Sequence, residues 1–497
     1  MPSGAPEMAT AYAAAAVPSR DRSGQVGPWW RRSFKPGQLP LSACCGAVMF
    51  VSTLLPLVSG HGRVLLVTFP ALATAMALVL YLRAPAGYIA FTWWIWLLTP
   101  AVRRLVDHQI GWTPVSTVML TPYLVTALAT LTLIRRIGNL AMLDLAALCF
   151  TMAGIAYAYI IGIWSVGPVP ATFGLLTWVV PVVFGFHLAA TWRRYEFWRD
   201  ATQTAFRHGL IVLAIYGVIQ FAWVPPWDGS WMDHAGMSSI GRPLPFQVRV
   251  FGTLNAPGVY AIFLMAGLLI GFNRRASIFG SAAKPVVWLG FLLSQVRSAW
   301  LGYGVGLGLL LMRTPLSRSV KLLAAGILLL LAIAPLVQID AVERVALPRI
   351  MSLGQLGSDH SLRERMQLYG EFFDVAAGNI PGAGIGSTNL ATKLSNNGQL
   401  TRLGVIDSGV LEIMYVFGWP GSLLYALGIA MAMVSALWGW QRKTDPFTLG
   451  ARAVVAAILI QIVFFNPLGG AVGMIFWSFL GLILAGRQFH EVCRRTA

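Results

Sequence analysis

The chain has 497 residues, of which 57% are hydrophobic and 11% are charged, with a net charge of +18. Soluble globular proteins carry about 25% charged residues, so this composition excludes an ordinary water-soluble enzyme, an intrinsically disordered chain and a disulfide scaffold. The four cysteines show neither metal-ligand spacing nor a disulfide framework, and we assign no function to them: Cys44, Cys45, Cys149 and Cys493.

The N-terminal residues 1–40 are rich in Ala, Pro, Gly and Ser, and we interpret them as a mostly disordered cytoplasmic tail. Beyond them, apolar stretches run for roughly 17 to 25 residues, the length a helix needs to cross about 30 Å of hydrocarbon. A transmembrane β-barrel would instead alternate apolar and polar residues. We therefore expect an all-α, polytopic transmembrane helical bundle of about 12 to 14 spans. The fourteen candidates are 41–59, 64–82, 86–102, 116–134, 139–163, 168–190, 208–224, 255–272, 281–294, 298–312, 320–337, 408–440, 453–466 and 468–486.

The basic residues predict the orientation of these spans. When the spans alternate across the membrane, most Lys and Arg fall on the side of the N-terminus, many of them in short loops such as Arg135-Arg136 and Arg193-Arg194. The positive-inside rule places these loops in the cytoplasm, together with both termini. The net charge is therefore a topology signal, and we expect no nucleic-acid partner.

This topology divides the chain into a series of segments. Eleven spans within 41–337 precede a long periplasmic loop at 338–407, and three spans at 408–486 precede a cytoplasmic tail at 487–497. A shorter outer loop at 225–254 is rich in Trp and Pro.

Two arginines at the outer face stand out because positive charge belongs on the other side. Arg249 comes just before the span at 255–272, where Asn255 or Thr253 can cap the helix and Pro257 lies near its first turn. Arg297 lies in a turn of about three residues between two apolar spans. Each arginine is either a residue at the membrane interface or an anion-binding residue. The glycines that follow Arg297 indicate close helix packing.

A helix with one apolar face is expected in the long loop at 361–378. Ser361 and Glu364 fit a capping box at its start. Arg363 lies on the solvated face, whereas Arg365 lies at the edge of the aromatic face. Arg365 can therefore either form an ion pair or contact a ligand.

The end of the loop combines a glycine-rich turn with a carboxylate. Gly384 and Gly386 belong to a Pro-Gly-Ala-Gly-Ile-Gly run, a tight turn whose backbone can approach a ligand. Asp407 lies at the start of the next span, where it can act either as the helix cap or as a general base. His360 is the outward histidine best placed for acid–base chemistry. No metal-ligand spacing or P-loop is present, so we expect no metal and no cofactor.

In their order around the long loop, these stretches resemble the O-antigen ligase and O-antigen/exopolysaccharide polymerase family of bacterial inner-membrane proteins. The resemblance covers roughly residues 245–440. It rests on the runs Arg-x-Phe-Gly-Thr-x-Asn-x-Pro at 249–257 and Ser-x-x-Arg-Ser-x-x-Leu-Gly at 294–302, Arg365 with Tyr369, the glycine turn, and Asp407 before Gly418-Trp-Pro-Gly421.

The resemblance implies a membrane glycosyltransferase. The family transfers a glycan from undecaprenyl pyrophosphate to an acceptor hydroxyl at the periplasmic face, without metal or nucleotide. Carried over to this sequence, Arg297 and Arg365 bind the pyrophosphate, Arg249 is a weaker third ligand, and Asp407 takes the place of the base. The implied partners are the undecaprenyl-pyrophosphate-linked oligosaccharide, membrane lipids and other polysaccharide-assembly proteins.

One departure from the family pattern bears on the reaction. Ligases have a His-Asn pair at the start of the helix after the loop, whereas this chain has Asp407-Ser408. This favours a polymerase of polysaccharide repeat units, with O-antigen ligase as the alternative. A lipid-linked oligosaccharide flippase would need charge near the middle of the bilayer, for which only Asp144 and Glu412 are candidates. A non-catalytic assembly scaffold is a further alternative.

Overall fold

The computed structural model describes residues 40–235, 240–272, 283–313, 370, 378–396, 399, 406, 408–437 and 445–495. These residues form helices and one isolated antiparallel bridge, between Gly241 and Val248. Nine of the described helical segments are long and apolar enough to cross a membrane. The prediction of an all-α polytopic bundle is therefore confirmed.

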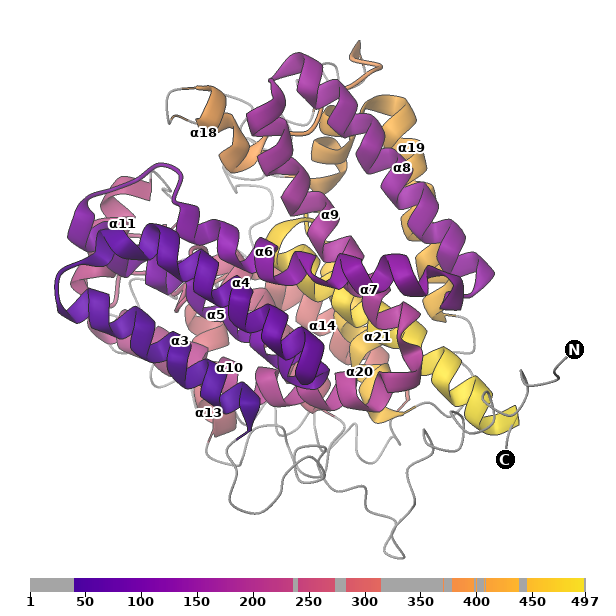
Figure 1. The fold of residues 1–497 in the computed structure, drawn as a ribbon, viewed down its shortest axis with the longest axis horizontal. Helices are drawn as coiled ribbons and strands as arrows, with labels where there is room; N and C mark the ends of the chain where they lie inside the picture. Colours follow the sequence, from indigo (N-terminus) through magenta and orange to yellow (C-terminus); the bar gives the residue numbers. More distant parts are fainter. Residues whose placement is uncertain are drawn as a thin grey trace, which may run out of the picture.

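Most of the helices overlap a predicted span (Figure 1). The described helices are α3 (Leu41–Val58), α4 (Leu65–Arg83), α5 (Pro85–Ile110), α6 (Thr121–Ala127), α7 (Ala129–Arg136), α8 (Met142–Ser165), α9 (Pro168–Ala190), α10 (Tyr195–Ala222), α11 (Pro226–Ala235), α12 (Pro257–Gly271), α13 (Ala283–Leu293), α14 (Arg297–Leu311), α18 (Thr392–Ser395), α19 (Gly409–Leu437), α20 (Pro446–Leu459) and α21 (Gly470–Arg495). Short 3₁₀ turns flank several of them, among them η1 (Gly62–Val64) and η6 (Asn389–Ala391). Thirteen of the fourteen expected spans contain such a helix, and 320–337 lies outside the described residues.

The fold departs from the expected spans in several places. α10 begins at Tyr195, whereas the span was expected from residue 208, and α20 begins at Pro446 and ends at Leu459, whereas the span was expected at 453–466. The expected span 116–134 is interrupted at Leu128, so that α6 and α7 are separate helices. The outer loop 225–254 contains α11, which we did not expect. Pro226 begins α11 and Asp228 lies in its first turn, as helix N-termini prefer. Its Trp231 is buried in a small apolar cluster.

Close backbone contacts join the principal pairs of long helices. α8 packs along α19, and α9 packs along α21, as Figure 1 shows. Gly185 and Gly481 face each other across the second pair, and a Cβ atom on Gly481 would lie 2.0 Å from the Gly185 carbonyl oxygen. Small residues at such crossings let apolar helices approach closely in a membrane.

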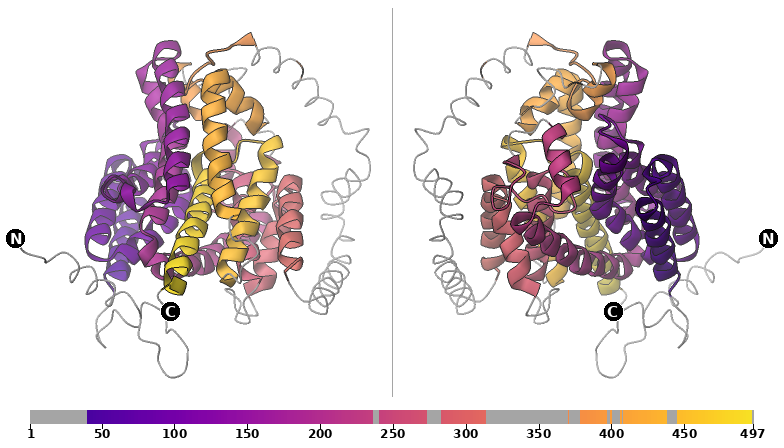
Figure 2. Two further views of the ribbon diagram at one scale, coloured as in Figure 1. Left: turned by 90° about the vertical axis from the view of Figure 1, so that its right-hand side faces the viewer. Right: turned by 90° about the vertical axis from the view of Figure 1, so that its left-hand side faces the viewer.

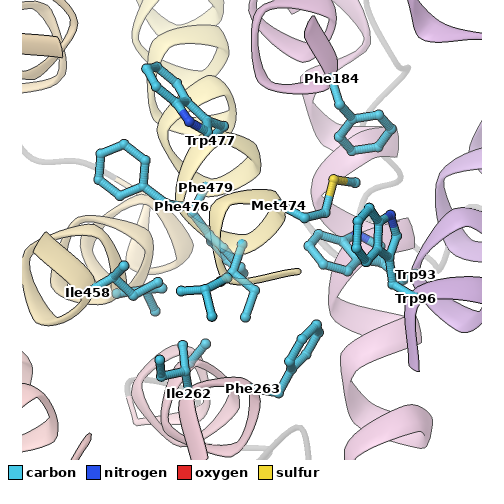
Figure 3. Packing of buried hydrophobic residues seen from close by; sticks show 14 of the residues in the cluster. Trp93, Trp96, Phe184, Ile262, Phe263, Ile458, Met474, Phe476, Trp477 and Phe479 are labelled. Carbon is cyan, nitrogen blue, oxygen red and sulfur yellow. The ribbon is translucent and has the colours of Figure 1, made fainter. Parts of the chain in front are cut away.

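The bundle has a filled centre and an apolar outer surface. In the most apolar part of α21, 83% of the residues are buried, compared with 11% in α3, so α21 is central and α3 peripheral. Aromatic side chains such as Trp93, Trp477 and Phe263 fill the centre (Figure 3). Leu423 on α19 is largely exposed, as a lipid-facing residue would be. The views in Figure 2 show the upper ends of α8 and α19 projecting beyond the helices around them.

Candidate active site

The connections that hold the candidate residues meet at one end of the bundle, which we call the loop end. It is formed by residues 111–116, 223–256, 294–296 and 378–396. Side chains of one connection contact another: Arg249 donates a hydrogen bond to Gln295, and the Lys393 ammonium lies near the Trp112 ring. The loop end therefore gathers segments that lie far apart in the sequence.

The run 249–257 is held by a buried arginine of α5. Arg104 donates hydrogen bonds to the carbonyl oxygens of Gly252 (2.7 Å) and Leu254. Gln220 of α10 accepts hydrogen bonds from the backbone N–H groups of Phe251 and Gly252, each at 3.0 Å. Backbone groups that no helix pairs are thus paired by side chains, as a buried irregular segment requires.

Arg104 forms a fully buried ion pair with Asp228 of α11. Its Nε atom lies 2.9 Å from a carboxylate oxygen of Asp228, and neither side chain is exposed. The other carboxylate oxygen accepts hydrogen bonds from Tyr216 (2.9 Å) and Gln220 (2.6 Å). Burial raises the pKa of Asp228, while Arg104 opposes that rise. Arg104 therefore favours the charged carboxylate, and the pair fixes α11 and the run 249–257 to α5.

One of the predicted site arginines, Arg249, contacts the turn between α13 and α14, which directly precedes a second one, Arg297. Arg249 donates a hydrogen bond of 3.0 Å from Nη2 to the carbonyl oxygen of Gln295. Gln295 has a φ of +54°, so the chain reverses sharply there, and Arg297 begins α14. The predicted three-residue turn is Ser294–Val296. Both arginines are half-buried.

The predicted cap of the following helix is wrong. No side chain caps α12, which begins at Pro257 as expected. Thr253 instead donates to the Leu97 carbonyl oxygen (2.6 Å), and the Asn255 side-chain oxygen lies 3.4 Å from Arg104. Both side chains bind α5, because the buried run supplies partners that compete with the helix terminus.

The glycine turn packs against the backbone of three helices. Gly382, Gly384 and Gly386 all have positive φ, between 82° and 101°. A Cβ atom on Gly384 would lie 2.3 Å from the Gly162 nitrogen of α8. The Gly384 N–H donates to the Val416 carbonyl oxygen of α19 at 2.9 Å. These glycines thus bring the loop backbone onto α8, α9 and α19, and packing accounts for their conformation.

The residues after this turn are anchored by a buried carboxylate. Glu412 of α19 accepts hydrogen bonds from Thr388 (3.0 Å) and Asn389 (2.6 Å). Ser408 occupies the cap position of α19, and its Oγ accepts the Leu411 N–H at 3.4 Å. Ser408 thus takes the cap role that the sequence left open for Asp407.

The structure describes only some of the predicted site residues. It places Arg249 in contact with the turn that precedes Arg297, and Gly384 and Gly386 in a packed turn. The remaining candidates lie outside the described residues, namely His360, Arg363, Arg365 and Asp407. Within the described ranges, no group of three or more His, Cys, Asp or Glu side chains is arranged to hold a metal ion.

Sequence reasoning missed Arg104 and Asp228. Arg104 lies just beyond the expected span 86–102, and Asp228 lies in the outer loop 225–254. They are 124 positions apart, so no local pattern pairs them. A charged residue at the edge of a span was the available signal.

Arginine side chains at the loop end of a polytopic helical membrane protein suit phosphate or pyrophosphate, because the planar fork of arginine matches these groups. Residues 282–426 match a family model described as O-antigen ligase. The resemblance inferred from the sequence is thereby confirmed for α13, α14, the glycine turn and the first part of α19. The run 249–257 lies outside the matched residues. No curated protein matches the chain.

This match supports O-antigen ligase- or polymerase-type glycan processing by a membrane glycosyltransferase-like enzyme. The family implies lipid-linked oligosaccharides and membrane lipids as the molecules with which the protein interacts. Arg297, the turn before it and the glycine turn all fall inside the matched residues.

Proposed function

We propose that the protein is a repeat-unit polymerase for a surface or secreted polysaccharide. It transfers a glycan from undecaprenyl pyrophosphate to a hydroxyl of another lipid-linked repeat unit. The observation that carries the proposal is the contact of Arg249 with the turn that leads into Arg297, within the matched segment. That contact joins the segment that carries Arg249 to the turn directly before Arg297.

The proposed roles follow from the charge that develops in the reaction. The bond between the sugar carbon and the pyrophosphate oxygen breaks, and a bond from that carbon to the acceptor oxygen forms. Arg297 and Arg365, supported by Arg249, stabilise the growing negative charge on the leaving pyrophosphate. Asp407 orients the acceptor hydroxyl and takes its proton late in the reaction. Neither metal nor nucleotide is needed for this step.

Four further residues have supporting roles in this proposal. His360 and Arg363 lie near Arg365 in the sequence and supply additional polar contacts to the glycan. Gly384 and Gly386 hold the end of the loop against the bundle, which their packing supports. The site then faces the periplasm, with the protein in the bacterial inner membrane and both termini in the cytoplasm.

The ligase is the second candidate, because the matching family model is described as O-antigen ligase. Asp407-Ser408 in place of a His-Asn pair favours the polymerase. A flippase is less well supported, since both candidate charges within the membrane have structural partners. Asp144 pairs with Arg487 at 2.9 Å, and Glu412 accepts hydrogen bonds from the loop.

The test is replacement of Arg297 or Arg365 by Ala in cells that make the polysaccharide, followed by analysis of lipid-linked and finished glycans. Arg63→Ala is the matched control, because Arg63 is an exposed arginine of η1, and η1 is hydrogen-bonded to α5 near the loop end. Loss of polymerase leaves single repeat units, and loss of ligase leaves long chains on undecaprenyl pyrophosphate. Normal polymer in both site variants would refute the catalytic assignment.

A further inference from the structure

A second group of cationic side chains surrounds Trp112, which follows α5 at the loop end. The Arg103 guanidinium carbon lies 5.1 Å from the centre of the indole ring, and the Lys393 ammonium nitrogen lies 5.9 Å from it. The His234 ring of α11 is stacked on the same indole at 5.8 Å. Three separate segments of the chain thus converge on one aromatic ring.

The charges in this group are only partly neutralised. Arg103 uses Nε to bind Asp107 at 3.1 Å and Nη2 to bind the Thr113 carbonyl oxygen at 2.7 Å. Over the described part of the chain, Nη1 of Arg103 and the Lys393 ammonium have no hydrogen-bond acceptor. Asp107 is therefore the only carboxylate bound to the two cations among these residues.

Lys393 is half-buried, so its ammonium group is not fully hydrated. Burial lowers the pKa of Lys393, and the neighbouring Arg103 lowers it further. A buried cation without a counter-charge is costly. An anion placed between Lys393 and Arg103 would remove that cost.

The side chains around Trp112 are held in place by two neighbouring parts of the fold. Trp112 packs against the apolar cluster that contains Trp231 and Phe251. Lys393 follows Thr388 and Asn389, which are anchored to Glu412. The cationic side chains are therefore positioned before any ligand arrives, which reduces the entropy lost on binding. Figure 1 shows α18, which carries Lys393, and α11 on the same side of the molecule.

We propose that Lys393, Arg103 and Trp112 form a second anion-binding site, made of residues other than Arg249 and Arg297. It takes one anionic group of the lipid-linked glycan, either a phosphate of the carrier or the carboxylate of an acidic sugar. Only the identity of this ligand rests on the proposed function. The anion site itself rests on the arrangement of the cations around the indole.

The experiment measures binding of two probes to the full chain in nanodiscs by isothermal titration, with inorganic pyrophosphate and methyl glucuronide as the probes. All variants carry Arg297→Ala, so that pyrophosphate cannot bind through that residue. Lys393→Ala is compared with Lys393→Arg, which keeps the charge. Lys284→Ala is the matched control, since Lys284 is an exposed lysine at the start of α13.

Lys393→Ala is expected to weaken binding of at least one probe about tenfold or more, because a hydrogen bond to a charged group is lost. Lys393→Arg and Lys284→Ala are expected to change binding less than about twofold. An effect on pyrophosphate assigns the site to a phosphate, and an effect on methyl glucuronide assigns it to an acidic sugar. Equal binding by Lys393→Ala and Lys284→Ala for both probes would overturn the proposal. The polymerase proposal is tested separately, by analysing the glycans made in cells by the Arg297→Ala protein with Lys393 intact. Normal polymer in those cells would count against the polymerase but not against the anion site.

Discussion

The buried ion pair between Arg104 and Asp228 allows a sharp test of how the loop end is held. In Asp228→Asn, the guanidinium of Arg104 stays buried next to a neutral side chain. Arg104 also donates to the carbonyl oxygens of Gly252 and Leu254, so it cannot turn towards water without releasing the run 249–257. The variant therefore exchanges a paired charge for an uncompensated one.

The expected loss of unfolding free energy follows from the burial of this pair. Removing one partner of a buried ion pair costs about 3–5 kcal/mol. We expect about 3 kcal/mol, the lower end of that range, because the Asn amide oxygen can still accept from Tyr216 or Gln220. These donors lie 2.9 and 2.6 Å from the present carboxylate.

The matched control is Asp144→Asn, which breaks a buried pair of the same length far from the loop end. Asp144 of α8 lies 2.9 Å from Arg487 of α21, and its side chain is 1% exposed. Stability is measured from reversible unfolding in mixed micelles, and pyrophosphate binding by isothermal titration. Both variants should lose stability, whereas only Asp228→Asn should weaken pyrophosphate binding, because it alone frees the segment that carries Arg249. A loss below about 1 kcal/mol, or equal binding by the two variants, would refute the reasoning.

Three further predictions concern the loop turn, the α20 cap and Lys393. Gly384→Ala should lower the free energy of unfolding by about 3 kcal/mol, because the added Cβ would lie 2.3 Å from the α8 backbone. Gly304→Ala, which has open space around it, should not lower the free energy of unfolding in the same assay. Burial would raise the pKa of Asp445, but Arg199 at 3.0 Å lowers it below its ordinary value. The stability lost in Asp445→Asn, about 1–2 kcal/mol at pH 7, should therefore vanish as pH falls through that lowered pKa; a constant difference down to pH 2 would contradict this. Anion binding through Lys393 should weaken as pH rises through the lowered pKa of Lys393, at a lower pH than for an ordinary lysine. Binding titrations at several pH values should show no such weakening in Lys393→Arg.

The helices were predictable because the signal for them is local. Each run of apolar residues is long enough to cross the bilayer, and a helix is the way a single segment pairs its own backbone there. The same reasoning missed α11, because ten residues containing Trp, Asp and His do not resemble a span. The interruption at Leu128 was also missed, since Leu128 itself is a good helix former and no Gly or Pro stands next to it.

Arg249 and Arg297 could be proposed as site residues from the sequence, but the contacts around them could not. Arg249 and Arg297 stand out in the sequence because they place positive charge on the outer side. The contact of Arg249 with Gln295 depends on how α12, α13 and α14 pack, which no local pattern contains. Lys393 resembles an ordinary loop lysine, and its contact with Trp112 is set by the Glu412 anchor on α19.

The ion pair of Asp144 with Arg487 has a consequence for how the protein is made. The two residues are 343 positions apart, so α8 enters the membrane long before its partner is synthesised. Until α21 is made, the Asp144 carboxylate in the first turn of α8 lacks the Arg487 cation, and the central place of α21 in the bundle is not filled. Insertion of the last helix is thus the step that completes the bundle, and a chain shortened before Arg487 should be degraded rather than accumulate as a partly working enzyme.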